Sequence, residues 1–189
     1  YRRQRQMVIR DSYVIAPTAK IRSLLYRYRV RPVVRIVPSG IDTDLYAAAR
    51  PDERLRAQLN IPADAPVALF VGRLGYEKNV SAVLRAFAAA GTGYLILAGD
   101  GPYRSTLERE AADSGAGDRI RFVGMVDRAE LPAYYKTADA FVNASKSETQ
   151  GLTVIEALAS GLPVVCLDDE SYRGAVADGE NGFLCADEA

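Results

Sequence analysis

Short apolar runs alternate with helix-length segments along most of the chain, and this alternation restricts the fold more than any other feature. Between residues 67 and 185, apolar runs of four or five residues are separated by single segments of helical periodicity. Strands joined through single helices lie parallel, and a parallel sheet has helices on both faces. We therefore predict an α/β fold with a doubly wound parallel sheet. The expected strands are residues 67–71, 94–98, 119–123, 138–142, 164–167 and 182–185, and the expected helices are residues 79–89, 103–113, 127–136, 151–160 and 171–177.

The part of the chain before this alternation is strongly basic at its start. Residues 1–31 contain eight arginines and one lysine against one aspartate, while the whole chain is neutral. Such a split predicts two different surfaces. Three side chains are placed as helix caps: Thr18, Asp52 and Asp127, the last paired with Glu130 as a capping box. The expected elements are a basic helix over residues 1–10, strands over 12–16 and 33–37, a turn over 38–42, and helices over 18–29 and 52–59.

Composition excludes several kinds of site. The chain has no histidine, which rules out histidine-based triads and histidine zinc sites within these residues, and no spacing of metal ligands is present. No run of eighteen apolar residues predicts a membrane span. Cys166 and Cys185 both end apolar runs, so both are expected to be buried thiols of a reducing compartment.

The segment from Ser145 to Pro163 carries the strongest indication of function. A polar loop with Glu148 follows an expected strand, and the helix that starts at Gly151 should bury a stripe of Leu152, Ile155, Leu158 and Ala159. The free amides of Gly151, Leu152 and Thr153 would lie at the carboxyl end of the sheet, where they can hold a phosphate. Helical side chains lean toward the N-terminus, so Glu156 can reach back toward the same place. Carboxylates beside a phosphate suit ligand hydroxyls, and the combination indicates a nucleotide sugar.

Other strand ends add candidate contacts. Gly72-Arg-Leu-Gly-Tyr-Glu-Lys-Asn79 places Arg73 and Lys78 at the mouth of the sheet, although two solvated surface charges remain the alternative. Gly99-Asp-Gly101-Pro resembles a dinucleotide fingerprint but has Arg104 in place of the third glycine, and it can equally be a tight turn. Gly124 and Met125 follow the third strand of the alternating region.

Glu148 and Glu156, separated by seven residues and followed by Ala-Leu-Ala-Ser-Gly-Leu-Pro-Val-Val, resemble the E-x7-E signature of retaining glycosyltransferases of family 4. The resemblance extends from about residue 33 to residue 185 and implies the Rossmann-like, C-terminal half of a two-domain B-type fold. Residues 1–31 then resemble the end of an N-terminal acceptor domain with its linker, and residues 32–189 a donor-binding domain without its closing C-terminal helix. A chain of this extent is expected to bind the donor without transferring its sugar.

The resemblance also implies roles for individual residues. Gly72, Arg73 and Lys78 would hold the donor diphosphate with the amides of Gly151 to Thr153, while the backbone at Gly124 and Met125 would pair with the nucleobase. Glu156 would hold the ribose, and Glu148 would face the transferred sugar. Neither a metal nor another cofactor is expected beyond the donor itself.

The residues after Glu148 differ from the usual E-x-F-G form. Glu148-Thr-Gln150-Gly resembles bacterial diacylglycerol glucosyltransferases, which implies UDP-glucose as donor, diacylglycerol as acceptor and a hydrogen bond from Gln150 to the sugar. The basic residues 1–31 would then favour an anionic membrane surface at the inner face of a bacterial cell, with the enzyme otherwise cytoplasmic and no nucleic acid as partner. A solvated helix is the alternative for that charge.

Three alternatives stay open from the sequence. The enzyme could transfer a mannosyl or glucosyl group to another lipid or glycan. An NAD-dependent oxidoreductase shares the architecture, although Arg104 and the lack of an acid placed to hold a ribose at the end of the second strand disfavour it. A nucleotide-sugar-binding module without catalytic activity is the third.

Overall fold

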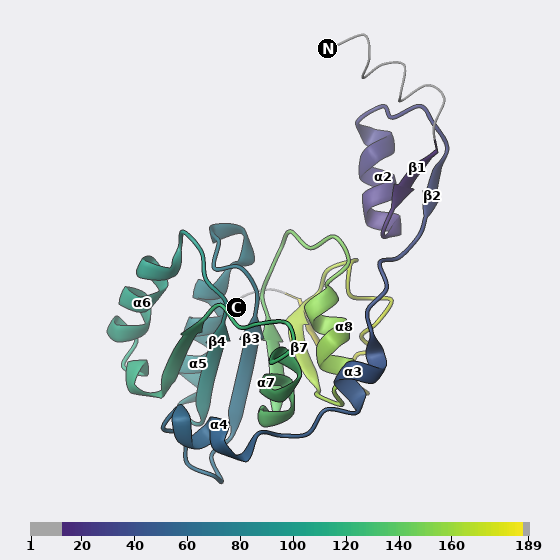
Figure 1. Cartoon of the computed structure of the whole chain (residues 1–189). Helices are drawn as coiled ribbons and strands as arrows, with labels where there is room; N and C mark the ends of the chain where they lie inside the picture. Colours follow the sequence, from purple (N-terminus) through teal and green to yellow (C-terminus); the bar gives the residue numbers. More distant parts are fainter. Residues whose placement is uncertain (1–12, 187–189) are drawn as a thin grey trace.

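The computed structural model describes residues 13–186, which form a large α/β unit and a small unit preceding it (Figure 1). Six parallel strands build the large sheet in the order β5-β4-β3-β6-β7-β8. The chain starts this sheet at β3, moves outward on one side, and then returns to continue from β6 on the other. The predicted doubly wound, Rossmann-like parallel sheet is confirmed. Its strands are β3 (Val67–Val71), β4 (Tyr94–Ala98), β5 (Ile120–Gly124), β6 (Ala140–Asn143), β7 (Val164–Leu167) and β8 (Gly182–Cys185).

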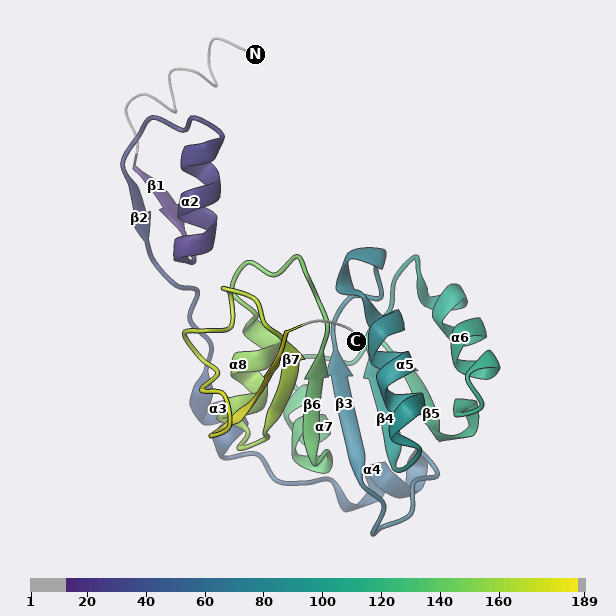
Figure 2. The ribbon, with the colours of Figure 1, turned by 180° about the vertical axis from the view of Figure 1, so that it is seen from behind.

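Helices cover both faces of this sheet. Helices α3, α7 and α8 lie on the face toward the viewer in Figure 1, and α5 lies on the opposite face in Figure 2. Alternate strand residues face alternate cores: Leu69 packs in the cluster of Tyr135 and Val154, whereas Phe70 packs in the cluster of Leu84. The helical segments are α3 (Thr43–Ala47), α4 (Glu53–Gln58), α5 (Val80–Ala90), α6 (Arg104–Asp113), α7 (Leu131–Thr137) and α8 (Leu152–Ala159), with 3-10 turns η1 (Tyr76–Lys78) and η2 (Gly117–Arg119).

The small unit is a single β-α-β motif. Strands β1 (Val14–Ala16) and β2 (Val34–Ile36) pair in parallel and are joined by α2 (Ala19–Arg27), which Thr18 caps as predicted. Strand β2 therefore belongs with β1, while the division proposed between residues 31 and 32 stays a prediction. The motif leaves many large apolar side chains exposed: Tyr13, Ile15, Leu24, Tyr26, Tyr28, Val33, Ile36 and Val37. The basic helix predicted for residues 1–10 lies outside the described residues.

Local predictions failed where backbone turns replaced helices. The helix expected over residues 171–177 is wrong: the segment forms turns, in which the Tyr172 N–H donates to the Asp169 carbonyl and the Ala175 N–H to the Tyr172 carbonyl. Helix α7 begins at Leu131, and Asp127 accepts through its backbone carbonyl from Glu130 and Leu131, so the predicted capping box is wrong. The Asp52 cap is confirmed, since its carboxylate accepts from the Arg54 N–H. Helix α3 was not predicted.

Two burial predictions also need correction. Cys166 is buried, and burial raises its pKa to about 12, but Cys185 is exposed because β8 is the edge strand of the sheet. Helix α8 buries Val154 and Ala157 completely and leaves Leu152 38% exposed, so its inner face is rotated from the predicted stripe. The reason is that α8 packs against α3 as well as against the sheet.

Candidate functional site

The loops that carry the candidate residues meet where the strand order reverses. Strands β3 and β6 are neighbours, and the chain leaves them for opposite sides of the sheet, which is the arrangement that opens a ligand crevice at their carboxyl ends. The loop after β6 contacts the loop after β3: the Ser147 Oγ donates to the Glu77 carbonyl at 3.4 Å, and the Asn79 Nδ2 donates to the Ala144 carbonyl at 3.2 Å. The two loops that carry Lys78 and Glu148 therefore lie side by side.

The turn Gly99-Asp-Gly101 packs directly on the loop after β3. A Cβ at Gly99 would lie 1.9 Å from the Gly72 carbonyl oxygen, and one at Gly101 would lie 2.5 Å from that of Leu74. Both glycines are therefore required by the close approach of two backbones. Asp100 follows β4, yet its oxygens accept from the Gly101 N–H at 2.7 Å and from Arg104 at 2.9 Å. These bonds lower the pKa of the Asp100 carboxyl and occupy its oxygens.

Lys78 and Glu148 form an ion pair between the segment after β3 and the loop after β6. The Lys78 Nζ lies 2.6 Å from the Glu148 Oε1, and the two side chains are only 23% and 13% exposed. The 3-10 turn η1 places Lys78, and Asn79 ends that turn in the left-handed conformation. A partly desolvated ion pair holds its geometry better than an exposed one, and an exposed ion pair contributes little to stability. The two charges neutralise each other.

Arg73 is placed differently. Its guanidinium pairs with the Glu77 carboxylate four residues later, and the two side chains are 62% and 38% exposed. The Glu77 carboxylate also accepts from its own backbone N–H, and these contacts together lower its pKa. Arg73 thus lies in the same loop as Lys78, but its side chain faces solvent. To contact a phosphate, it would exchange Glu77 for the ligand.

The N-terminus of α8 opens on a residue with an unusual backbone. Gly151 has a φ of +70°, and a Cβ there would lie 2.6 Å from the Tyr172 ring. The first intrahelical bonds to the Gly151 carbonyl come from Val154 and Ile155. The amides of Gly151, Leu152 and Thr153 precede those bonds, so they have no intrahelical acceptor and suit an anion.

Glu156 is buried within a cluster of tyrosines. The Tyr135 hydroxyl donates to the Glu156 Oε2 at 2.9 Å, and the Tyr46 ring packs edge-to-face on Tyr135 with centroids 5.7 Å apart. Burial, and then the Glu156 carboxylate, raise the pKa of Tyr46 to about 12. Within the described residues the Tyr46 hydroxyl has no hydrogen-bond partner. One oxygen of Glu156 is thus fixed by Tyr135, which orients the carboxylate.

Gln150 has a structural use. Its Nε2 donates to the Ser39 carbonyl at 2.9 Å, and its Oε1 accepts from the Ser39 N–H at 2.8 Å. The side chain is buried and ties the turn at residues 38–42 to the loop that carries Glu148. A hydrogen bond from Gln150 to a sugar stays a prediction. The second N–H of its amide would donate this bond, because the first donates to Ser39.

Three partners of the site were not found from sequence. Tyr135 binds Glu156, Tyr46 packs on Tyr135, and Tyr172 lies against Gly151, and single tyrosines carry no local signal of such a role. Gly124 ends β5 with a φ of +74°, and its carbonyl accepts from the Gly99 N–H at 2.7 Å, whereas Met125 in the loop that follows is 78% exposed. Among residues 13–186 no group of three or more potential ligands could hold a metal ion.

Comparison with known proteins decides the family. The family described as "Glycosyl transferases group 1" matches residues 51–189. The chain belongs to this family. Its members include the retaining family 4 enzymes that the E-x7-E spacing resembled, and the fold described above is half of the B-type architecture.

Two curated members of the group 1 family are similar over 90% of this chain. Both carry the name alpha-monoglucosyldiacylglycerol synthase: the one from Streptococcus pneumoniae is 39% identical over 181 residues, and the one from Acholeplasma laidlawii 36% over 178 residues. These matches cover 41% and 45% of the two proteins, so the chain spans less than half their length.

Among solved structures, sucrose-phosphate synthase from Thermosynechococcus elongatus is 31% identical with a TM-score of 0.83, covering 98% of this chain and 48% of that one. Anabaena HepE, solved with UDP-glucose, is 24% identical with a TM-score of 0.82, and the match covers 95% of this chain and 51% of that one. This likeness shows that the two proteins share the fold. Within the described part of this group 1 chain, no helix is long and apolar enough to span a membrane.

Proposed function

We propose that this chain binds the donor of a retaining hexosyltransferase, a nucleotide sugar of the UDP-glucose type. The observation that carries the proposal is the Lys78–Glu148 ion pair beside the junction of β3 and β6, with the α8 N-terminus and the buried Glu156 following Glu148 directly in the chain. Cations and helix amides suit a diphosphate, and carboxylates suit hydroxyls. A ligand with a diphosphate between two hydroxyl-rich groups uses all of these contacts.

The roles follow from the position of each group. Glu156, fixed by Tyr135, would accept from the ribose, while Glu148 would face the hexose. The diphosphate would take Lys78 from its ion pair with Glu148 and Arg73 from Glu77. Charge on the leaving diphosphate would then be stabilised by two cations and the amides of Gly151 to Thr153, a task that a metal ion can perform elsewhere. Gly72, Gly124 and Met125 would contact the donor through their backbones.

A panel of ligands tests this function by calorimetry on the purified chain. UDP and UDP-glucose are expected to bind with and without EDTA, and added magnesium is expected to change neither affinity. NAD is expected not to bind, because Asp100 is engaged by Arg104 and Gly101. Binding of NAD without UDP would favour an oxidoreductase, and a strict need for magnesium would contradict a diphosphate site made of cationic side chains and amides. Comparison of UDP with GDP identifies the base.

For the acceptor we propose a diacylglycerol lipid. Support comes from the names of the two relatives that match 90% of the chain and from the basic character of residues 1–31. Anionic lipid attracts basic residues by about 1 kcal/mol each near the surface. The proposed site of action is therefore the inner face of a bacterial membrane.

Assays of the full-length protein should show glucose transfer to diacylglycerol in anionic vesicles and little to soluble sugars. The 189-residue chain alone is expected to bind the donor without transfer, because it matches only one half of the relatives. Turnover on soluble acceptors with none on lipid would overturn the lipid acceptor and leave the donor site intact. Measurable transfer by the 189 residues alone would show that the acceptor groups lie within them.

A further inference from the structure

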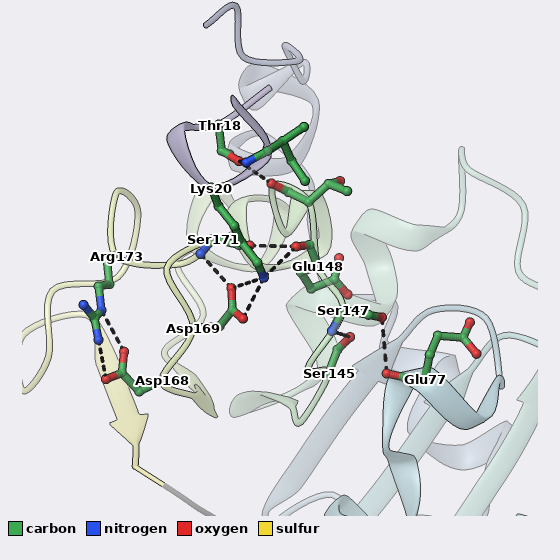
Figure 3. A network of polar contacts seen from close by, with 12 residues as sticks. Thr18, Lys20, Glu77, Ser145, Ser147, Glu148, Asp168, Asp169, Ser171 and Arg173 are labelled. Atoms are coloured by element: carbon green, nitrogen blue, oxygen red, sulfur yellow. Dashed lines mark hydrogen bonds and ion pairs between the residues drawn. The ribbon is translucent and has the colours of Figure 1, made fainter. Parts of the chain in front are cut away.

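Lys20 of the small unit reaches into the loop that carries Glu148. It lies in the first turn of α2, and its ammonium group donates to both oxygens of Asp169 at 2.7 Å, to the Ser171 Oγ at 3.2 Å and to the Glu148 carbonyl at 3.0 Å (Figure 3). The Lys20 and Asp169 side chains are 27% and 17% exposed. An ammonium has three protons to donate, so these contacts use its full capacity.

The contact is part of a larger connection between the small unit and the loop after β6. The Ser171 Oγ also donates to the Glu148 carbonyl, at 2.8 Å, so this one carbonyl accepts two hydrogen bonds. The next carbonyl, that of Thr149, accepts from the Thr18 Oγ1 at 2.8 Å. Two successive peptide groups of the loop are therefore held by the start of α2, and Figure 3 shows both bonds converging on the loop from the side of the small unit.

The backbone and the side chain of Glu148 are held from different directions. Lys20 and Ser171 bind its carbonyl, whereas Lys78 binds its carboxylate. Asp169 keeps Lys20 in place: burial opposes its ionisation, but hydrogen bonds from Lys20 and Ser171 outweigh burial and lower the pKa of the Asp169 carboxyl. Asp169 is thus a carboxylate at neutral pH. Loss of the ammonium would remove one of the two hydrogen bonds to the Glu148 carbonyl, and with it part of the restraint on where Glu148 points.

We propose that Lys20 is a positioning residue for Glu148: it holds the Glu148 peptide so that the carboxylate faces the sugar of the bound donor. This inference rests on the proposed function, since it needs a sugar beside Glu148. It adds a side chain from outside the large sheet to the donor site. It also makes the arrangement of the small unit a determinant of how the sugar, as opposed to the nucleotide, is bound.

Calorimetry with UDP and UDP-glucose separates the two parts of the ligand. Lys20→Met keeps the side-chain length and removes the charge, and it is expected to weaken UDP-glucose about fivefold while changing UDP little, a smaller loss than that of a direct charge-assisted hydrogen bond. Lys20→Arg is expected to restore most of the preference for UDP-glucose over UDP. Asp169→Asn should act in the same direction with a smaller effect. Arg27→Met, on an exposed position of the same helix, is the matched control and should change neither affinity.

A second measurement distinguishes positioning from a general loss of structure. In a Glu148→Ala background, Lys20→Met should add no further loss of UDP-glucose affinity, because the carbonyl is still present but the carboxylate is gone. The thermal midpoint should fall by a similar amount in both backgrounds, since the bonds of Lys20 are the same in each.

Two results would overturn the role of Lys20: a Lys20→Met variant that matches Arg27→Met in its affinity for UDP-glucose, or a loss of the same size with and without Glu148. Both would leave normal binding by the unmodified chain and so would leave the proposed function standing. A wild-type chain that binds neither UDP nor UDP-glucose would overturn the proposed function, and the role of Lys20 in donor binding with it.

Discussion

Replacing Glu156 with alanine is expected to weaken UDP binding about tenfold to a hundredfold, the equivalent of about 1.5–3 kcal/mol for hydrogen bonds to a charged group. The Glu156 carboxylate is buried and accepts from the Tyr135 hydroxyl at 2.9 Å, so the carboxylate is oriented before a ligand binds. Its removal takes away the acceptor proposed for the ribose hydroxyls. Calorimetry with UDP measures the effect directly.

Two variants control for indirect effects of this change. Glu156→Ala also leaves the Tyr135 hydroxyl buried without its acceptor, which costs stability, so Tyr135→Phe is measured beside it to show how much orientation alone contributes. Glu148→Ala is the second control, and it should leave UDP nearly unchanged but weaken UDP-glucose. Equal losses of UDP affinity in the two glutamate variants would contradict the division of roles between ribose and sugar.

Gly151→Ala is expected to lower the free energy of unfolding by about 2–4 kcal/mol and to abolish tight UDP binding. Two costs add at this position. The backbone has a φ of +70°, which disfavours a side chain, and the new Cβ would lie 2.6 Å from the Tyr172 ring. Tyr172 is fully buried and cannot move aside without opening the core. Displacement of the backbone at residue 151 or of the Tyr172 ring would shift the α8 N-terminus, where the phosphate is proposed to bind.

Gly161→Ala is a matched control for the backbone term. Gly161 ends the same helix at a φ of +78°, and a Cβ there would meet nothing within 4 Å. Its replacement should cost only about 1 kcal/mol, with UDP binding retained. Urea unfolding of both variants measures the difference. Equal destabilisation at the two glycines would show that Tyr172 yields to the new methyl group and that the contact does not restrain the loop.

The nature of the sheet and the positions of its strands were determined by the sequence itself. Apolar runs such as Val67–Val71 and Tyr94–Ala98 are bounded by turn residues and lie in the core of the structure where the pattern placed them. A continuous apolar run indicates such a strand because a parallel sheet covered on both faces buries successive residues of each strand. The spacing of Glu148 and Glu156 indicated the family for a similar reason, since a loop and the first turns of the following helix are adjacent in the chain.

Only the tertiary structure decided which side chains hold these two glutamates. Lys20 binds the Glu148 peptide across 128 residues, Lys78 binds its carboxylate across 70, and Tyr135 binds Glu156 across 21. The same is true of the inner face of α8 and of the turns at residues 171–175, which follow from packing against α3 and Gly151. Local propensity is a weak preference that tertiary contacts override. A pattern read along the chain therefore locates a strand or a helix, whereas the orientation of a charged group depends on partners that only folding brings beside it.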